Sequence, residues 1–501
     1  MRAIILAGGN ESLRPLTFTK PKPLIPLINK PIIEHMVEYL QSHYISDISI
    51  ATDDILEQMI EYFRNEQHVN LSYPMETHPL GTAGSVKNVK YLDETFVVVS
   101  GDIITDINLR ELIRLHKKSG GLLTIALSPV KDTNRFGIAE LEGDGKIIRF
   151  FEKPAGKCYS DLANTGIYVI EPEAMDYIPG GYFDFAEDHF PILIKKGDIF
   201  GYVTDKFWVD IGHPDDYARA IDWKLGQIRK NVPPNLNCET FNNVSIGEQS
   251  EIGNSIIMGP TVIGDDVIIK DNCFIGPYTC VGNGANIDEY SSIQNSVLFE
   301  DVFVGKRSRI GGCFVGEYTV IGENAKINDA TVSGYCKLGR AIEIANGSNI
   351  WPFTTIPPSS IIDGDIKGFV QSSMSGDFLR ILPEEESFYF NMQKGRSILS
   401  TGFVANGIEE FVNILKKVDQ RSIDYHLKGN FNSFAQWIRC VFKEDKLAEK
   451  IDEVDENDKR SRKKLIEMMS SHITKKRANT VDKIVDEINN KEVIKGENCT
   501  A

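Results

Sequence analysis

Aliphatic residues recur at every sixth position through the middle of the chain, and this spacing limits the possible folds more than any other feature. The series runs through Ile263, Ile269, Ile275, Val281, Ile287, Ile293 and Phe299. Its phase slips by one before Val304 and Ile310, and again before Val315, Ile321 and Ile327. Small residues often follow the aliphatic ones. Three short strands per coil need an inward aliphatic residue on each face and a small residue at each turn, so the spacing predicts a parallel β-helix.

A different pattern precedes this repeat, from residue 1 to about residue 233. Short apolar runs that suit strands cover Ala3–Leu6, Ile48–Ala51, Phe96–Val99 and Leu122–Leu127. Amphipathic stretches that suit helices alternate with them and cover Ile32–Leu40, Leu56–Phe63 and Leu109–His116. Such alternation predicts an α/β domain with a mostly parallel, Rossmann-like sheet.

The chain after the repeat has no six-residue phase. Prolines in residues 350–383 predict a connector, and apolar residues at helical spacing from Ile408 to Leu415 predict a small, mainly helical domain that ends in a charged tail. We therefore expect three domains, at residues 1–233, 234–379 and 380–501. The last of these has no predicted role.

The charge balance excludes several functions. The chain has 55 Lys and Arg against 71 Asp and Glu, a formal net charge of -16. A surface this acidic does not suit general nucleic-acid binding, which depends on neutralising phosphates. No apolar run is long enough to span a membrane, and the N-terminus does not resemble a secretory signal. We expect a cytoplasmic protein with neither a nucleic-acid nor a membrane partner.

Phosphate-binding features lie near the N-terminus. The first predicted strand runs into Gly8-Gly9, and paired glycines let backbone N–H groups approach a nucleotide. The segment Lys20-Pro21-Lys22-Pro23 follows, in which prolines hold two cations in an extended loop. A glycine turn beside fixed cations suits a polyphosphate.

Two aspartates follow predicted strands. Asp102 comes after Phe96–Val99, and Asp210 ends the apolar run Phe207-Trp208-Val209. Open α/β sheets bind ligands at the carboxyl ends of their strands. Two carboxylates there predict a shared Mg²⁺ that bridges substrate phosphates.

Nine short motifs in a fixed order resemble the sugar-1-phosphate nucleotidyltransferases: LAGG, LRPLT, KPKPLIP, PLGTAG, GD, FG, FEKP, NTGIY and WVDIG. With the added coil, the chain resembles their mannose-1-phosphate guanylyltransferase branch, with a left-handed β-helix. The resemblance covers residues 1 to about 360. It implies a Mg²⁺-dependent transfer from a nucleoside triphosphate, GTP in that branch, to mannose-1-phosphate, with release of pyrophosphate. Glucose-1-phosphate and N-acetylglucosamine-1-phosphate are the alternative acceptors.

The resemblance also implies a role for individual residues. Lys22 would pair with the phosphates, Asp102 and Asp210 would bind Mg²⁺, and Arg14 would be the remaining arginine of the first loop. The base, ribose and phosphates would lie on Leu6, Ala7, Gly8, Gly9, Gly81 and Thr82. The sugar phosphate would lie on Gly137, Glu152, Lys153 and Asn164.

The first loop departs from the family pattern. After Gly8-Gly9 the family has one variable residue, then GTR and LRP, whereas this chain has Asn10-Glu11-Ser12 before Leu13-Arg14-Pro15. The missing arginine is the family's catalytic cation on the triphosphate, and Glu11 near its place would repel phosphate oxygens. An alternative function is therefore a weak or inactive regulatory paralogue that binds a nucleotide sugar and pairs with an active homologue.

The β-helix itself offers no catalytic base. Acyltransferases built on such coils generally use a histidine, and none of the nine histidines lies between residues 214 and 425. We expect the coil to serve contacts within a homo-oligomer, or with an active homologue in a hetero-oligomer.

Overall fold

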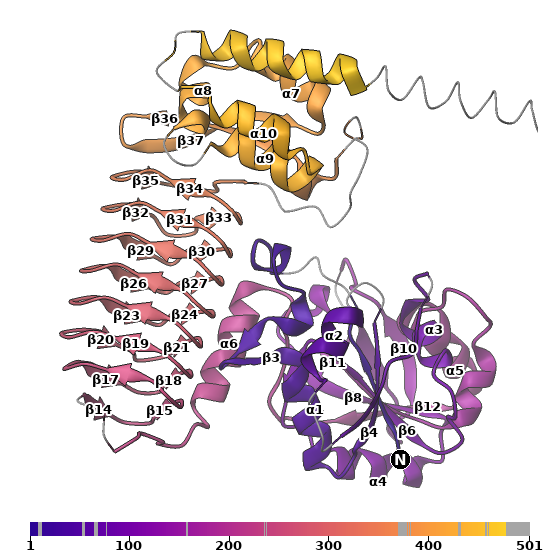
Figure 1. The fold of residues 1–501 in the computed structure, drawn as a ribbon. Coiled ribbons are helices and arrows are strands. Elements are labelled where there is room, and N and C mark those ends of the chain that lie inside the picture. Colours follow the sequence, from indigo (N-terminus) through magenta and orange to yellow (C-terminus); the bar gives the residue numbers. More distant parts are fainter. Residues whose placement is uncertain are drawn as a thin grey trace, which may run out of the picture. The chain divides into compact units, whose positions relative to one another are not determined.

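A computed structural model gives the fold (Figure 1). It describes residues 1–476 except 9–12, 53–55, 65–68, 77, 157–158, 235, 237, 369–377, 379, 381, 429–431, 456–457 and 459. The chain divides into two compact units, Met1–Gly226 and Gln227–Ala501. Within the described residues, every helix is too short or too polar to cross a membrane.

The first unit is built on a nine-stranded sheet. Its parallel part has the order β5 (Asn70–Ser72), β4 (Asp47–Ala51), β1 (Ala3–Leu6) and β6 (Phe96–Ser100). Antiparallel strands extend it from β6: β11 (Leu162–Ile170), then β9 (Ile138–Leu141) and β10 (Ile147–Phe151). Of the remaining two strands, β8 (Leu123–Pro129) pairs antiparallel with β11, and β12 (Ile199–Val203) pairs in parallel with β8. The predicted α/β class is confirmed.

Helices cover both faces of this sheet (Figure 1). They are α1 (Ile32–Ser42), α2 (Leu56–Tyr62), α3 (Gly81–Lys87), α4 (Leu109–Ser119), α5 (Phe190–Lys196) and α6 (Pro214–Leu225). Successive side chains of a strand point to opposite faces, so Ile5 belongs to one apolar core and its neighbour Ile4 to the other. Each predicted strand and helix of this unit is present within three residues of its expected bounds.

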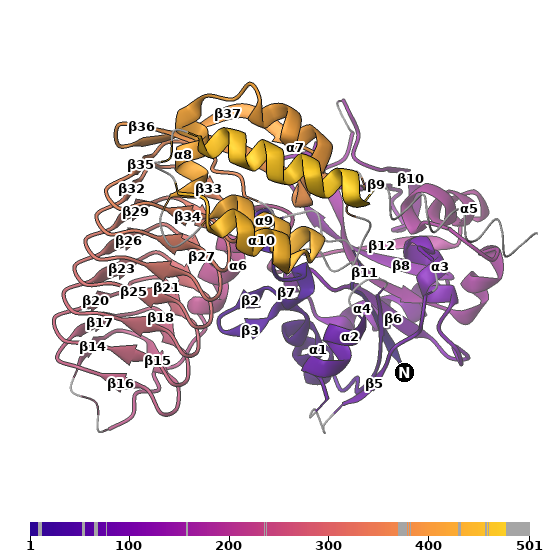
Figure 2. The same ribbon diagram turned by 45° about the horizontal axis from the view of Figure 1, so that its top comes forward.

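The second unit begins with a parallel β-solenoid. Its strands stack into three sheets in which each strand pairs with the one a full coil later (Figures 1 and 2). One sheet begins with β15 (Val244–Ile246), β18 (Thr261–Ile263) and β21 (Thr279–Val281), and a second with β16 (Glu251–Ile252), β19 (Ile268–Ile269) and β22 (Asn286–Ile287). The third begins with β14 (Glu239–Phe241), β17 (Ile256–Met258) and β20 (Phe274–Ile275). The predicted β-helix is confirmed.

Two details of the predicted repeat are wrong. Val281 pairs with Leu298 of β24 (Val297–Leu298), and Leu298 rather than Phe299 lies in the solenoid core, so the phase slips one strand earlier than predicted. Adjacent apolar residues at 298 and 299 hide this slip in the sequence. The coils also run on through the predicted connector, as β34 (Thr355–Ile356) and β35 (Ile361–Ile362). Prolines at the turns do not interrupt the ladder, because they lie between strands.

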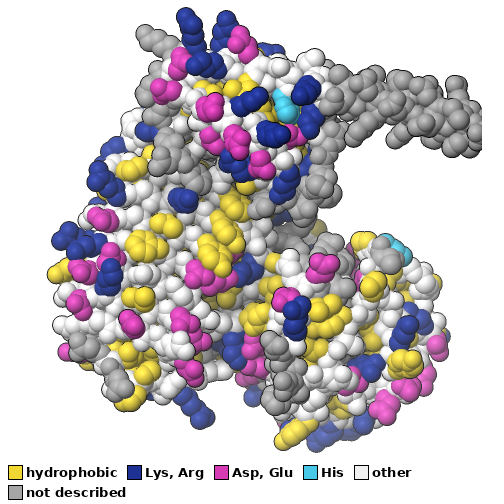
Figure 3. Space-filling view, in the orientation of Figure 1, with side chains coloured by type: hydrophobic (Ala, Val, Ile, Leu, Met, Phe, Trp, Pro, Cys, Tyr) yellow, Lys and Arg dark blue, Asp and Glu magenta, His cyan; other side chains and the backbone are white. Residues whose placement is uncertain are grey.

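A helical region closes the second unit, as predicted. It contains α7 (Ile408–Leu415), α8 (Gln420–Leu427), α9 (Ser433–Phe442), α10 (Asp445–Asp452) and a helix over residues 461–476, packed round a core of aromatic and aliphatic side chains. Its surface mixes Lys and Arg with Asp and Glu (Figure 3). A hairpin of β36 (Phe388–Lys394) and β37 (Ser397–Ala405) precedes these helices. Because β37 pairs with β35, the hairpin continues one sheet of the solenoid.

Candidate active site

Asp102 and Asp210 lie side by side in the first unit. Asp102 follows β6 and leads into β7 (Ile103–Thr105), which pairs antiparallel with β13 (Trp208–Asp210) so that Asp210 faces Ile103. The backbone N–H of Ile211 donates to the Asp102 carbonyl at 2.9 Å. A short two-stranded sheet thus brings together two carboxylates that are more than a hundred residues apart in the chain.

Lys22 supplies a cation to this pair. It lies in a short 3₁₀ turn, Lys22–Leu24, which begins after Pro21 and closes with a hydrogen bond from the Ile25 N–H to the Lys22 carbonyl. Its side chain is almost fully buried, and its Nζ donates to Asp102 Oδ2 at 2.5 Å. The prediction of an extended loop is wrong at Lys22, because Pro21 and Pro23 frame a 3₁₀ turn there, and this turn places the ammonium beside the acidic pair.

The electrostatics of the pair suit a cation. Burial, together with the negative charge of Asp102, raises the pKa of Asp210 to about 7, and the positive charges of Lys22 and Arg135 only partly oppose this. Two neighbouring carboxylates with too little positive charge between them fit a divalent ion that also binds substrate phosphates. The described residues form no cluster of three or more His, Cys, Asp or Glu side chains placed to hold a metal.

Arg135 is a further cation near Asp210 that the sequence reasoning missed. Its guanidinium forms an ion pair with Asp216, a buried residue in the first turn of α6, and also lies near Gly212, which follows the Asp210 strand. The positive charge of Arg135 lowers the pKa of Asp210. Its position directly before the Phe136-Gly137 motif was the available signal.

The glycine turn lies beside these groups. Leu6 ends β1, and its carbonyl accepts a hydrogen bond from the Gly101 N–H at 2.8 Å. A Cβ on Gly101 would lie 3.0 Å from that carbonyl oxygen and 3.3 Å from the Ala7 Cα, so β1 and the Asp102 segment approach closely because residue 101 is glycine. Gly8 follows Ala7, whereas Gly9 and residues 10–12 of the shortened loop lie outside the described residues.

Gly81 and Thr82 begin α3 and contact the segment before α5. Gly81 has φ +72, and a Cβ there would lie 2.7 Å from the Phe183 carbonyl oxygen. The Thr82 hydroxyl donates to Asp184 at 2.7 Å and accepts from the Phe185 N–H at 2.9 Å. The Thr82 hydroxyl therefore makes structural contacts. If this turn binds the nucleotide as predicted, its backbone rather than the Thr82 hydroxyl would make the contact.

Gly137, directly before β9, and Glu152, directly after β10, come together with Asn164 on β11. The Asn164 N–H donates to the Gly137 carbonyl at 2.8 Å, and a Cβ on Gly137 would lie 2.7 Å from Glu152 Oε2. The Asn164 amide donates to the Tyr168 hydroxyl and accepts from the Gly166 N–H. Burial raises the pKa of Glu152. This cluster can offer a carboxylate and an amide to sugar hydroxyls.

Lys153 and Arg14 occupy more open positions. Lys153 is exposed, has φ +41, and its Nζ lies 4.0 Å from Glu152. Arg14 is exposed, and its guanidinium lies 4.9 Å from the centre of the Phe18 ring. The structure thus places Lys22 with the two aspartates and Lys153 with the Glu152 cluster, whereas Arg14 packs on its own loop.

Comparison with known families gives two matches. Residues 2–225 match the family described as Nucleotidyl transferase, and residues 257–366 match the GMPPB C-terminal domain. The first match covers the unit that holds the aspartate pair, and the second covers most of the solenoid. Residues 367–501 lie outside both.

Individual relatives cover the same part of the chain. A UTP–glucose-1-phosphate uridylyltransferase of Synechocystis sp. is 35% identical over 62% of this chain and 86% of its own length. Mannose-1-phosphate guanylyltransferase 1 of Arabidopsis thaliana is 32% identical over 62% and 89%. A mannose-1-phosphate guanyltransferase of Yarrowia lipolytica is 33% identical over 52% and 72%.

Proposed function

Because this chain belongs to the nucleotidyl transferase family, we propose that it is an enzyme that transfers a nucleoside monophosphate from a nucleoside triphosphate to a sugar-1-phosphate. A phosphate oxygen of the sugar-1-phosphate attacks the α-phosphorus. The bond from the α-phosphorus to its bridging oxygen breaks, and pyrophosphate leaves with that oxygen. The products are a nucleotide sugar and pyrophosphate.

The observation that carries this proposal is the buried contact between Lys22 and Asp102 beside Asp210. Phosphoryl transfer of this kind asks little covalent chemistry of the protein, and its rate depends on alignment and on charge stabilisation. A buried ammonium stabilises the charge that develops on the phosphates. The glycine turn at Leu6–Gly8 lets the triphosphate lie close to the backbone N–H groups.

The roles of the remaining residues follow from their positions. Gly81 and the Thr82 backbone border the base and ribose. Glu152 and Asn164 bind sugar hydroxyls, and Gly137 leaves room for the sugar because it has no side chain. Lys153 binds the sugar phosphate from its exposed position. Arg14 would have to leave the Phe18 ring to reach the triphosphate.

Mg²⁺ belongs to the proposal. Asp102 and Asp210 would hold it, and the ion would neutralise the charge of the substrate phosphates. The raised pKa of Asp210 supports this assignment, because two close carboxylates whose negative charge is only partly balanced by nearby cations favour a bound divalent ion.

GTP and mannose-1-phosphate are the proposed substrates. The match of residues 257–366 to the GMPPB C-terminal domain supports this choice, as do the guanylyltransferase relatives. UTP and glucose-1-phosphate are the second candidate pair, because the relative with 35% identity is a uridylyltransferase.

The test is pyrophosphate release by the purified full chain with Mg²⁺. Four triphosphates are each combined with mannose-, glucose- and N-acetylglucosamine-1-phosphate. We expect the highest rate with GTP and mannose-1-phosphate, and loss of release in Asp102→Asn. Release with another pair alone would overturn the substrate assignment. Binding of a nucleotide sugar without turnover on any pair would instead establish the regulatory alternative, and copurification with an active homologue would identify its partner.

A further inference from the structure

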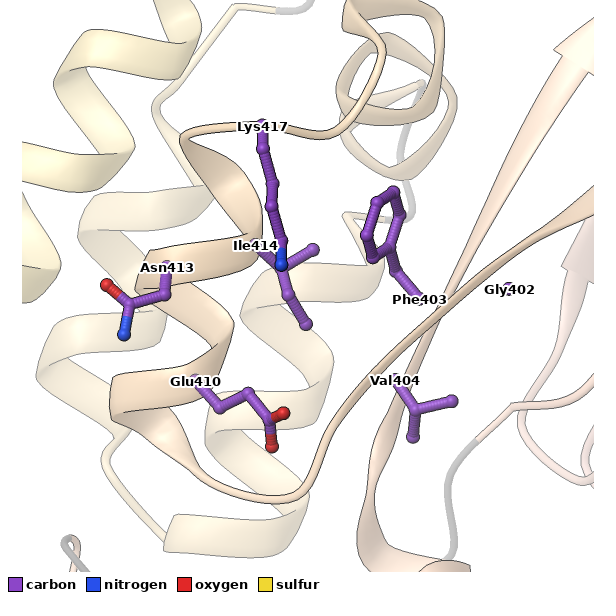
Figure 4. A pocket seen from close by; sticks show the side chains of 7 residues that line it. All are labelled: Gly402, Phe403, Val404, Glu410, Asn413, Ile414 and Lys417. Atoms are coloured by element: carbon purple, nitrogen blue, oxygen red, sulfur yellow. The ribbon is translucent and has the colours of Figure 1, made fainter.

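The helical region of the second unit has two recesses with polar groups. One is a groove between β37 and α7, lined by Phe403, Val404, Glu410 and Lys417 among others (Figure 4). Its charged groups already have partners, because Glu410 accepts from the Asn406 N–H at 3.0 Å and the Lys417 ammonium lies 5.1 Å from the centre of the Phe403 ring. This groove gives no sign of a missing ligand.

The other recess is a cavity where the last coils of the solenoid meet the hairpin and α8. Its lining includes Phe353, Thr354 and Thr355 from the solenoid, Asn391 from β36, and Tyr425 and His426 from α8. All of these residues belong to the second unit. The cavity therefore lies between the β-helix and the helical region, the part of the chain outside both matched families.

Four buried polar atoms that line this cavity have no hydrogen-bond partner among the described residues. They are Thr354 Oγ1, Thr355 Oγ1, Asn391 Oδ1 and His426 Nδ1. Thr354, Asn391 and His426 are each more than nine-tenths buried. Leaving such a group unsatisfied destabilises the fold, and four in one place are rare in a folded protein. Something polar must fill the cavity.

The neighbouring hydrogen bonds decide what each atom offers. His426 Nε2 accepts from the Asn391 backbone N–H at 2.9 Å, so in the neutral ring Nδ1 carries the hydrogen and is a donor. Burial lowers the pKa of His426 to about 3, which keeps the ring neutral. Asn391 Nδ2 donates to the Lys367 carbonyl at 3.2 Å, which leaves Oδ1 as a buried acceptor without a partner. The two threonine hydroxyls can do either.

An aromatic wall completes the site. Phe353 stacks on Tyr335, with ring centres 5.1 Å apart and planes 16° apart, and Tyr335 stacks on Tyr318 in the coil before. All three have φ between +54 and +61, where earlier coils have Gln249, Asp266, Gly284 and Asp301 at the same turn. Non-glycine residues with positive φ recur at turns along the whole solenoid, so this conformation belongs to the coil, and the aromatic stack is what distinguishes these last turns. The last ring of the stack lines the cavity.

The space limits what can enter. It amounts to about 30 Å³, where one water needs about 10–15 Å³ by the same measure. Two hydroxyl groups fit, and a whole hexose does not. The unpartnered atoms form a neutral set that both donates and accepts. Hydroxyl groups both donate and accept, so they can satisfy every member of this set. A carboxylate could accept from His426 Nδ1 and the threonine hydroxyls but would face a second acceptor at Asn391 Oδ1.

We propose that this cavity binds two neighbouring hydroxyl groups of a neutral polyol or sugar, which accept from His426 Nδ1, donate to Asn391 Oδ1 and bond the hydroxyls of Thr354 and Thr355, with the carbon skeleton beside Phe353. The two hydroxyl groups would enter the cavity, while the rest of the polyol or sugar stays at its mouth. The site is separate from the aspartate pair and does not depend on the proposed catalysis.

The test combines ligand titration with two isosteric substitutions. The unfolding temperature and the calorimetric heat of binding are measured for the full chain as glycerol or D-mannose is added. The ligand concentration is kept below about 20 times the fitted Kd. The variants are Thr354→Val and Thr355→Val, which remove a hydroxyl at nearly constant shape. Thr331→Val, on an earlier coil of the solenoid, is the matched control. We expect saturable binding in the wild type and control, and about tenfold weaker binding in the double variant Thr354→Val/Thr355→Val.

The outcomes separate clearly. A saturable effect of glycerol identifies a short polyol, and one of D-mannose alone identifies a sugar edge. Polyols also stabilise proteins non-specifically, but that effect does not saturate and is equal in all variants. Absence of saturable binding, or binding equal in the wild type and the double variant, would overturn the proposal and leave the cavity to water. Pyrophosphate release by the same variants, which we expect to be unchanged, keeps this result independent of the catalytic test.

Discussion

The ammonium of Lys22 lies 2.5 Å from a carboxylate oxygen of Asp102, although 80 residues separate the two in the chain. Lys22 is held by a proline-bounded turn, and Asp102 by the end of a buried strand. Neither side chain can withdraw far, so the cation stays beside the acidic pair before substrate arrives. Such preorganisation is the main way in which an enzyme stabilises developing charge.

Lys22→Met tests this cation. The substitution keeps most of the length of the side chain and removes its charge, so we expect pyrophosphate release to fall by about 10²–10³-fold. Lys117→Met, at an exposed position on α4, is the control and should retain full activity. Thermal unfolding of both variants shows whether the loss reflects misfolding. Activity within threefold of the wild type in a folded Lys22→Met protein would refute the role of this lysine.

The raised pKa of Asp210 predicts a pH dependence of stability. The unfolded carboxyl titrates near pH 4 and the folded one near pH 7, so the folded state holds the proton more tightly. This tighter proton binding stabilises the folded state fully below pH 4, and the stabilisation is lost as the pH rises through 7. An asparagine does not ionise, so the Asp210→Asn variant escapes this loss. We expect its free energy of unfolding in urea to exceed that of the wild type by an amount that grows between pH 5 and pH 8.

Two controls accompany that comparison. Asp205→Asn, at an exposed position nearby, should follow the wild type at both pH values. Mg²⁺ at pH 8 should stabilise the wild type more than Asp210→Asn, because it balances the ionised pair. A pH-independent difference between Asp210→Asn and the wild type would mean that Asp210 titrates normally in the folded protein.

Arg135→Gln should affect both folding and catalysis. It removes the closer of the two cations that pair with the buried Asp216 carboxylate, and a positive charge near Asp210. We expect a loss of about 2 kcal/mol in the free energy of unfolding, since the arginine is partly exposed, and a further rise of the Asp210 pKa. The pH profile of pyrophosphate release should shift to higher pH. Arg219→Gln, which removes the more exposed cation at Asp216, should leave that profile unchanged.

The helices and strands of the first unit could be predicted because the buried residues of each follow a hydrophobic pattern that is visible in the local sequence. Ile4 and Ile5 face opposite cores, so β1 reads as a continuous apolar run. The pairing of β37 with β35 could not be predicted, because a strand joins a distant sheet through long-range contacts that leave no local pattern.

The site was predictable to a similar extent. Strand ends and motifs singled out Asp102, Asp210 and Lys22, and the structure places them together. Arg135 escaped notice because its partner Asp216 lies 81 residues away on α6, and only the folded chain reveals that pairing. The unpaired atoms at His426 and Asn391 likewise appear only when solenoid, hairpin and helix are packed.

The first loop gives the final prediction. Residues 9–12 lie outside the described residues, so the prediction rests on sequence: Glu11 stands near the place of the family's catalytic arginine. A carboxylate there repels phosphate oxygens, whereas a guanidinium attracts them. We expect Glu11→Arg to raise the maximal rate of pyrophosphate release about tenfold, and Glu11→Gln, which only removes the repulsion, to give a smaller rise. Rates unchanged in both variants would show that this loop does not act on the triphosphate, leaving Lys22 and Mg²⁺ as the cations of the reaction.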